Sequence, residues 1–229
     1  MSSEQPIQTS EISISTEIQS VQGYLARPAG SAPRPAIILI HEWWGLNSHI
    51  REIAERYAHA GFYTVAVDLY DGRVTQDAGE AGKLMAGLDP QIALSKLKIL
   101  VDQLRASPDI SSLGVTGFCM GGVYSLLTAC TYQVEAAVPF YGIPDDLSCI
   151  ANLNCPILFI GGEKDQWITV EKMNRLSEAL QRNGKVGEVK IYPGADHAFF
   201  NDTRPEVYSP ADASDAWQRT LDFLHQHLK

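Results

Sequence analysis

The chain has 229 residues, 45% of them hydrophobic and 20% charged, with a formal net charge of −9. This length suits one hydrophobic core, so we expect a single domain over residues 1–229, with about residues 1–10 flexible. An acidic surface repels phosphate backbones, which argues against nucleic acid as a partner. The first residues lack a basic region followed by an apolar run, and no stretch approaches 18 apolar residues. We therefore expect a cytoplasmic protein without a membrane partner.

The polar and apolar residues alternate over residues 11–18, which is typical of a half-buried strand. Residues 21–26 would pair with this strand as an antiparallel hairpin, and the segment 28–35, rich in Pro and Gly, would form a turn. Next comes a continuous apolar run over residues 36–40, as in a strand that is buried on both faces of a parallel sheet.

Strands and helices then alternate to the end of the chain. Asn47 or Ser48 would cap the first helix, Gly61 would end it, and Asp89 with Pro90 would begin the third. The expected strands are 36–40, 63–67, 113–117, 136–141, 156–160 and 189–192. The expected helices are 49–60, 78–86, 90–105, 121–129, 170–182 and 213–227. This alternation indicates a mostly parallel sheet with helices on both faces.

Ligands of such sheets bind beyond the carboxyl ends of the strands. Five segments follow expected strands and carry polar or reactive side chains: residues 41–45, 68–70, 119, 161–165 and 194–197. We therefore expect these segments to converge on one rim of the sheet.

The segment TGFCMGG, residues 116–122, has the spacing of a nucleophile elbow, with Cys119 in place of the usual serine. Gly117 and Gly121 flank it and lack the Cβ atoms that would clash in a sharp strand-to-helix turn. The following helix would favour a thiolate, and the Met120 N–H would be an oxyanion donor. The alternative is that Cys119 is a buried core residue in a tight turn. A dinucleotide site is disfavoured, because the segment lacks G-x-G-x-x-G.

The remaining cysteines are Cys130, Cys149 and Cys155. No C-x-x-C pair occurs, so zinc-ribbon and thioredoxin readings lack their motif. We expect four free thiols in a reducing compartment, with a Cys149–Cys155 disulfide as the open alternative.

A nucleophile needs a base and a group that orients the base, in the chain order nucleophile, acid, histidine. His197 follows an expected strand, whereas the later histidines at 225 and 227 lie on the last helix. Asp165 ends a Gly-Gly-x-x-Asp loop and is our preferred acid. The competing carboxylates are those of Glu163, Asp145 and Asp146, whereas the side chain of Asp196, which adjoins His197 in the chain, is expected to point away.

The chain resembles the dienelactone hydrolases, also called carboxymethylenebutenolidases, over nearly its whole length. The resemblance is carried by HEWWG (41–45), DLY (68–70), GFCMGG (117–122), GGEKD (161–165), ADHAFFNDTRPEVY (195–208) and AWQRTLDFL (216–224). It implies an α/β-hydrolase fold with a triad of Cys119, His197 and Asp165, and neither a metal nor a cofactor.

The resemblance also gives Glu42 a role. HExxH would need a histidine where Gly45 stands, so Glu42 is not part of a zinc-protease motif. In the family, a glutamate at this position contacts the nucleophilic thiol and controls its ionisation, since a nearby carboxylate disfavours a thiolate. The Trp43 N–H would be the second oxyanion donor, and the side chains of Trp44 and Phe199 would line the substrate pocket.

The resemblance implies an anionic unsaturated lactone as substrate, with arginines on its carboxylate. This chain has Asn201 where the family has an arginine four residues after the catalytic histidine, and Arg204 or Arg73 would take its place. We expect a hydrolase of small esters or lactones, present as a monomer or homodimer. The alternatives are a general small carboxylesterase and a non-catalytic ligand-binding protein on the same scaffold.

Overall fold

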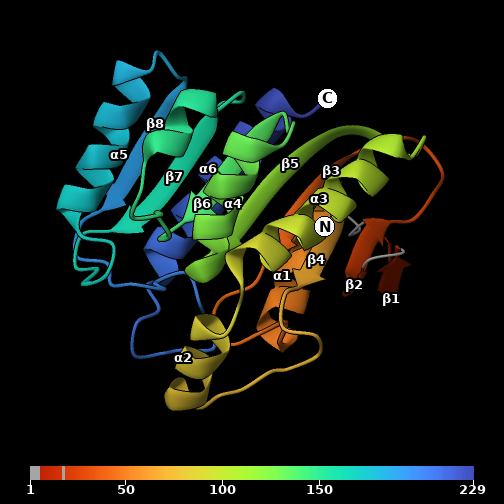
Figure 1. Cartoon of the computed structure of the whole chain (residues 1–229), viewed down its shortest axis with the longest axis horizontal. Helices are drawn as coiled ribbons and strands as arrows, with labels where there is room; N and C mark the ends of the chain where they lie inside the picture. Colours follow the sequence, from red (N-terminus) through yellow and green to blue (C-terminus); the bar gives the residue numbers. More distant parts are fainter. Residues whose placement is uncertain (1–5, 17–18) are drawn as a thin grey trace.

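The structure is a computed structural model that describes residues 6–16 and 19–229. Figure 1 shows the arrangement of its elements. The strands are β1 (Ile7–Ser15), β2 (Ser20–Pro28), β3 (Arg34–Ile40), β4 (Tyr63–Asp68), β5 (Ile110–Phe118), β6 (Ala136–Phe140), β7 (Ile157–Gly162) and β8 (Gly187–Tyr192). The helices are α1 (Ser48–His59), α2 (Ala78–Ala86), α3 (Pro90–Ala106), α4 (Met120–Thr131), the 3₁₀ helix η1 (Ser148–Asn152), α5 (Val170–Arg182) and α6 (Pro210–His227).

The eight strands form one sheet in the order β1-β2-β4-β3-β5-β6-β7-β8. β1 pairs antiparallel with β2, and β2 pairs antiparallel with β4, whereas the pairs from β4 to β8 are all parallel. The hairpin lies at one edge of the sheet, and β8 with α5 lies at the other (Figure 1). The mostly parallel sheet with an N-terminal antiparallel hairpin is therefore confirmed.

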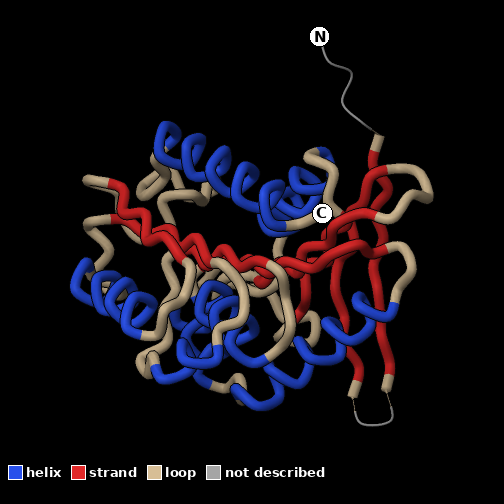
Figure 2. Tube along the Cα trace, turned by 90° about the horizontal axis from the view of Figure 1, so that it is seen from above, coloured by secondary structure: helices blue, strands red, loops and turns tan. Residues whose placement is uncertain are grey.

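Helices cover both faces of this sheet, as Figure 2 shows from above. In β3, Ile38 and Ile40 pack into a core with α3, α4 and α5, whereas Ile37 and Leu39 pack into a second core with α1 and α6. Successive side chains of a strand point to opposite faces, so one continuous apolar run supplies both cores.

The N-terminal segment differs from its expectation. Residues 7–10 belong to β1, because they pair in register with residues 25–28 of β2. The strand expected over 11–18 ends at Ser15, where Thr16 donates its N–H to the Gln19 carbonyl in a turn. Residues 1–5 and 17–18, the remaining parts of those two expectations, lie outside the described residues.

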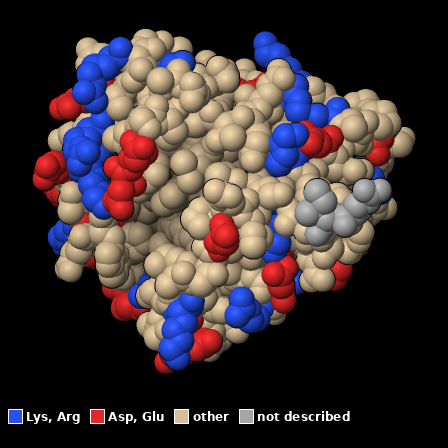
Figure 3. All heavy atoms as spheres, viewed as in Figure 1, with Lys and Arg blue, Asp and Glu red and all other residues tan. Residues whose placement is uncertain are grey.

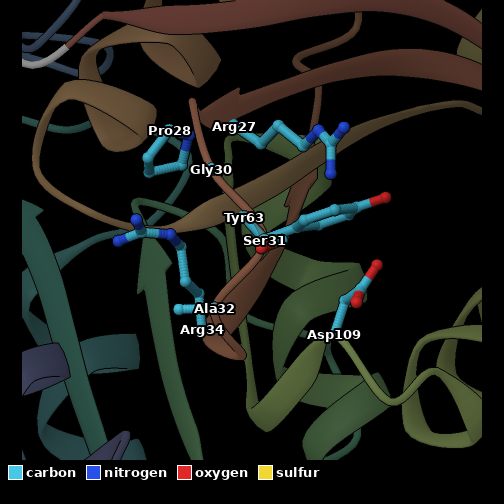
Figure 4. A pocket seen from close by; sticks show the side chains of 8 residues that line it. All are labelled: Arg27, Pro28, Gly30, Ser31, Ala32, Arg34, Tyr63 and Asp109. Atoms are coloured by element: carbon cyan, nitrogen blue, oxygen red, sulfur yellow. The ribbon is translucent and has the colours of Figure 1, made fainter.

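The two ends of the parallel strands differ in what they offer a ligand. At the amino ends, Figure 4 shows a cavity lined by Arg27, Tyr63 and Asp109 on one side and Arg34 on the other. Its volume is about 10 Å³, which is room for a single water molecule. The carboxyl ends of the strands carry the five segments that were expected to converge, and the candidate functional site lies at this end of the sheet.

Candidate active site

Cys119 lies in the sharp turn between β5 and α4. Its φ of 55° is in the left-handed region, which is unfavourable for a residue with a Cβ. The backbone is fixed there, because the Cys119 N–H donates to the Phe140 carbonyl at 3.1 Å and the Gly122 N–H donates to the Cys119 carbonyl at 2.9 Å. The residue is partly exposed, in contrast to a core cysteine. This is the strained elbow that displays a side chain at the tip of a strand.

The two flanking glycines are required by close backbone contacts. A Cβ on Gly121 would lie 2.2 Å from the Ile40 carbonyl oxygen and 2.7 Å from that of His41. A Cβ on Gly117 would lie 2.4 Å from the Gly121 carbonyl oxygen. The start of α4 therefore lies directly against the loop that follows β3, and this contact brings the HEWWG segment to the elbow.

Two backbone N–H groups at this contact are free. Within the described part of the chain, neither the Met120 amide nor the Trp43 amide has a hydrogen-bond acceptor. Met120 is the first residue of α4, where amides have no partner within the helix. These are the two donors that the sequence suggested for an oxyanion.

His197 and Asp165 are joined by a hydrogen bond. The distance from His197 Nδ1 to Asp165 Oδ2 is 2.6 Å, and the Asp165 side chain is 1% exposed. The other oxygen, Oδ1, accepts the backbone N–H groups of Trp167 at 2.9 Å and Ile168 at 2.8 Å. The carboxylate is thus fixed on both sides, and it orients the imidazole so that Nε2 is free for the thiol.

The surroundings of His197 favour its charged form. Burial alone lowers its pKa, but the hydrogen bond with Asp165 and the nearby Asp165 and Cys119 groups outweigh burial and raise the pKa to about 10. Cys119 thus lies near enough to the ring to act on its ionisation. The structure thus brings Cys119, His197 and Asp165 into one connected group.

The competing carboxylates are engaged elsewhere or exposed. Glu163 accepts the Gly194 N–H at 2.8 Å, and Asp145 pairs with Lys172 at 3.2 Å. Asp146 accepts from the Ser148 hydroxyl and N–H. Among the acids considered, Asp165 is the one that binds the His197 ring.

Glu42 is almost fully buried, with 2% of its surface exposed, and is held by Asn201. The Asn201 Nδ2 donates to Glu42 Oε2 at 2.8 Å. The Asn201 Oδ1 accepts from the Thr203 N–H at 3.0 Å and from the Thr203 hydroxyl at 2.6 Å. These bonds leave Asn201 only its N–H₂ group to offer Glu42, so the residue at the family's arginine position acts here as a neutral donor.

Burial raises the pKa of Glu42, and this effect exceeds the lowering by Asn201, His197 and Arg204. The buried Tyr141 hydroxyl lies beside the same carboxylate and also lowers its pKa, although the pair falls short of hydrogen-bond geometry. The Tyr141 ring contacts that of His197, with centroids 5.0 Å apart. Glu42 therefore acts on the site through its negative charge. Because the pKa of Glu42 is raised, its carboxyl group carries that charge only at a higher pH than an ordinary glutamate does.

Two neighbouring motif residues shape the loops around the site. His41 is buried and accepts the Leu69 N–H on Nε2 at 3.1 Å, so its Nδ1 is the protonated nitrogen that donates to the Glu42 carbonyl. Burial lowers the pKa of His41, in keeping with this neutral form. The Tyr70 hydroxyl contacts Met120 Sδ at 3.2 Å. Through these contacts the HEWWG segment binds the DLY segment, and the DLY segment contacts the start of α4.

A pocket of about 440 Å³ lies beside the HEWWG loop and Asn201. It is lined by Trp44, Asn47, Ser48, His49, Val74, Thr75, Gln76, Asn201, Thr203, Arg204 and Glu206. Trp44 and Arg204, two of the expected substrate-binding residues, line this pocket, whereas Cys119, His197 and Asp165 do not. Arg73 is exposed and outside this lining, and its Nε donates to the Tyr70 carbonyl at 3.2 Å.

Phe199 does not line the pocket, contrary to our expectation. It is completely buried and packs against Tyr141 and Tyr192, because the chain turns inward after His197 to complete the core beside α6. Trp167, which was not predicted, is 66% exposed and lies edge-on to His197 with ring centroids 4.9 Å apart. The available signal was an aromatic residue two positions after the predicted acid.

The other expectations concern thiols, metals and surface charge. All four cysteines are free, so Cys149 and Cys155 form no disulfide. The described residues contain no cluster of three His, Cys, Asp or Glu side chains suited to a metal ion, and none of their helices combines the length and hydrophobicity needed to cross a bilayer. On the face shown in Figure 3, basic and acidic side chains intermingle instead of forming one basic patch.

A sheet of this strand order, with a strained elbow after β5 and an acid and a histidine after β7 and β8, defines an α/β-hydrolase. The profile of the dienelactone hydrolase family matches residues 21–228. The chain belongs to the dienelactone hydrolase family, and so to a family of hydrolases.

Individual relatives agree with this assignment. The chain is 38% identical to "Protein usf" of Aquifex pyrophilus, with 91% of this chain and 94% of the relative covered. It is 34% identical to a "Putative carboxymethylenebutenolidase" of Aquifex aeolicus, with the same coverage. A crystal structure titled as a "Putative Dienelactone Hydrolase" from Klebsiella pneumoniae superposes with a TM-score of 0.88 at 30% identity, covering 96% of this chain and 99% of the other.

The contact at Gly121 yields a stability prediction. Gly121→Ala places a Cβ against two backbone carbonyls that cannot move without displacing β3, so we expect a loss of about 1–3 kcal/mol in the free energy of unfolding. Urea denaturation measures it. The matched control is Gly82→Ala in α2, where the added Cβ meets nothing within 4 Å, and there we expect a gain of about 0.5–1 kcal/mol. Equal effects at both positions would contradict the close contact.

The buried charge of Glu42 yields a second prediction. Its pKa is raised in the folded state, so between the ordinary value of 4.5 and the folded value the native state binds more protons, and stability falls as pH rises. Glu42→Gln keeps an acceptor for Asn201 without the charge. We expect its melting temperature to exceed that of the wild type at pH 8, with the difference shrinking towards pH 4.5.

Thermal melts at stepped pH values test this. The control is Glu52→Gln, which removes an exposed charge from α1 and should show no such trend. The melting temperatures of Glu42→Gln and the wild type are compared at pH 8 and at pH 4.5. If their difference is the same at both pH values, burial of the Glu42 charge does not destabilise the protein.

Proposed function

We propose that this protein hydrolyses ester or lactone bonds through an acyl-enzyme on Cys119. The connected group of Cys119, His197 and Asp165 is the observation that carries this proposal, because it supplies a displayed thiol, a base and an orienting carboxylate. The free amides of Trp43 and Met120 support it, since they would receive the negative charge that develops on the carbonyl oxygen.

In the first step, the Cys119 sulfur, as the thiolate, attacks the carbonyl carbon, and the carbonyl electron pair moves onto oxygen as an oxyanion. When the carbonyl re-forms, the bond to the alkoxy oxygen breaks, and the His197 imidazolium gives that oxygen its proton. In a lactone, the released hydroxyl stays attached to the acyl group, so the ring opens. The product of this step is a thioester on Cys119.

In the second step, His197 takes a proton from water, and the hydroxide attacks the thioester. The sulfur leaves as a thiolate, and the carboxylic acid is released. Asp165 keeps the imidazole in one orientation through both steps. We assign Glu42 the control of the thiol, because its charge acts on His197 and disfavours a neighbouring thiolate.

The test is a screen of lactones and 4-nitrophenyl esters with the wild type and single variants. Cys119→Ala should lower turnover by a factor on the order of 10⁶, because it removes the nucleophile. Asp165→Asn should lower it by about 10⁴, since an amide favours the wrong imidazole tautomer. Cys149→Ala is the control: it removes another partly exposed thiol and should retain activity.

Near-normal hydrolysis by Cys119→Ala would refute the acyl-enzyme. A ligand-binding protein without activity would show no turnover in the wild type, and Cys119 would remain unmodified by a thiol reagent between pH 6 and 9. A general carboxylesterase would cleave small esters and show no preference for lactones.

A further inference from the structure

The 440 Å³ pocket borders the candidate site, although neither Cys119 nor His197 is part of its lining. Its wall is contiguous with the site at two places. Trp44 directly follows Trp43, one of the two oxyanion donors, and Asn201 holds Glu42, whose charge acts on His197. On these two links we assign the pocket to the part of a substrate that lies beyond the reacting carbonyl.

The pocket has one permanently positive side chain, and that charge is already paired. Arg204 directs both Nε and Nη2 at Glu206 Oε1, each at 2.8 Å. The Arg204 guanidinium also lies 5.8 Å from the centre of the Trp44 ring, so it is placed between an aromatic face and a carboxylate. Glu206 is only two residues away in the chain, which keeps its carboxylate at a high local concentration.

The other groups around the pocket add no free positive charge. His49 is buried, and this burial lowers its pKa in spite of the nearby Asp202 carboxylate, so its ring is neutral at pH 7. At the start of α1, the Asn47 side chain already accepts the Ile50 N–H. Asn201 offers a neutral amide, and Glu42 lies directly behind it.

A carboxylate that enters this pocket would have to displace Glu206 from Arg204 and would also approach the Glu42 side chain. An uncharged group with hydroxyl, amide or carbonyl oxygens needs no such displacement. It meets side chains that both donate and accept hydrogen bonds, among them Thr75 and Gln76.

We propose that Glu206 determines substrate specificity: by occupying Arg204, it makes the pocket select esters and lactones with uncharged polar acyl groups over those with a carboxylate. The inference rests on the proposed ester or lactone hydrolysis. It assigns Glu206 a positioning role, because it acts on the substrate through Arg204.

The test uses two esters of the same shape, 4-nitrophenyl hydrogen adipate, which carries a terminal carboxylate, and 4-nitrophenyl adipamate, which carries an amide. The readout is the ratio of kcat/KM for the acid to that for the amide. We expect the wild-type ratio to lie below one. Glu206→Gln should raise it about three- to fivefold, because an exposed ion pair of this kind is of modest strength.

Two further variants sharpen the result. Glu178→Gln removes an exposed negative charge from α5, away from the pocket, and should leave the ratio as in the wild type. Adding Arg204→Gln to Glu206→Gln should abolish the increase. A wild-type preference for the acid, or a ratio that Glu206→Gln does not change, would overturn the proposal.

Calorimetric binding separates this inference from the hydrolysis itself. The same two esters are titrated into Cys119→Ala, with and without Glu206→Gln, so that the preference is measured without turnover. Tighter binding of the amide, reduced by Glu206→Gln, supports the specificity even when the wild type cleaves neither ester, which would refute only the proposed hydrolysis. Equal binding of the two esters contradicts the specificity.

Discussion

The Gly121 backbone lies against the carbonyl oxygens of Ile40 and His41, and the geometry of the candidate site depends on that contact. It sets the start of α4, with the free amide of Met120, beside the loop after β3, which carries the free amide of Trp43. A side chain of any size at residue 121 would separate them. The elbow therefore requires glycine for the approach of two backbones, in addition to the strained φ of Cys119 itself.

Buried polar groups then fix the loops that the contact brings together. His41 bridges the Leu69 amide and the Glu42 carbonyl, and Asn201 connects Glu42 to the loop after β8. Burial makes such bonds costly to break, because each lost partner would leave a desolvated polar atom. Segments that lie more than 150 residues apart in the chain thus form one rigid frame around the thiol.

Most of the fold was predictable from local sequence patterns. Apolar runs such as residues 36–40 signal buried strands regardless of context, and the caps at Asn47 and Asp89 mark helix starts through their own side chains. Residues 7–10 were assigned incorrectly, because their polar side chains resemble a loose terminus and only pairing with β2 makes them a strand. Edge strands of this kind are determined by their neighbour more than by their own composition.

The site was predictable where chemistry depends on chain order and placement at strand ends, as for the pairing of Asp165 with His197. It was not predictable where a role depends on packing. Phe199 lies two residues after His197, yet the chain turns inward there and buries the Phe199 side chain. The bond from Asn201 to Glu42 spans 159 positions, and the pairing of Arg204 with Glu206 depends on side-chain rotamers. No local pattern encodes either.

The double anchoring of the Asp165 carboxylate has a consequence for dynamics. With one oxygen bound to two backbone amides and the other to the imidazole, the side chain has no alternative rotamer that satisfies the same partners. The ring it orients is consequently confined before any ligand arrives. The His197 ring therefore loses little conformational entropy when the transition state forms. The conformational freedom that binding still has to restrict is that of the substrate.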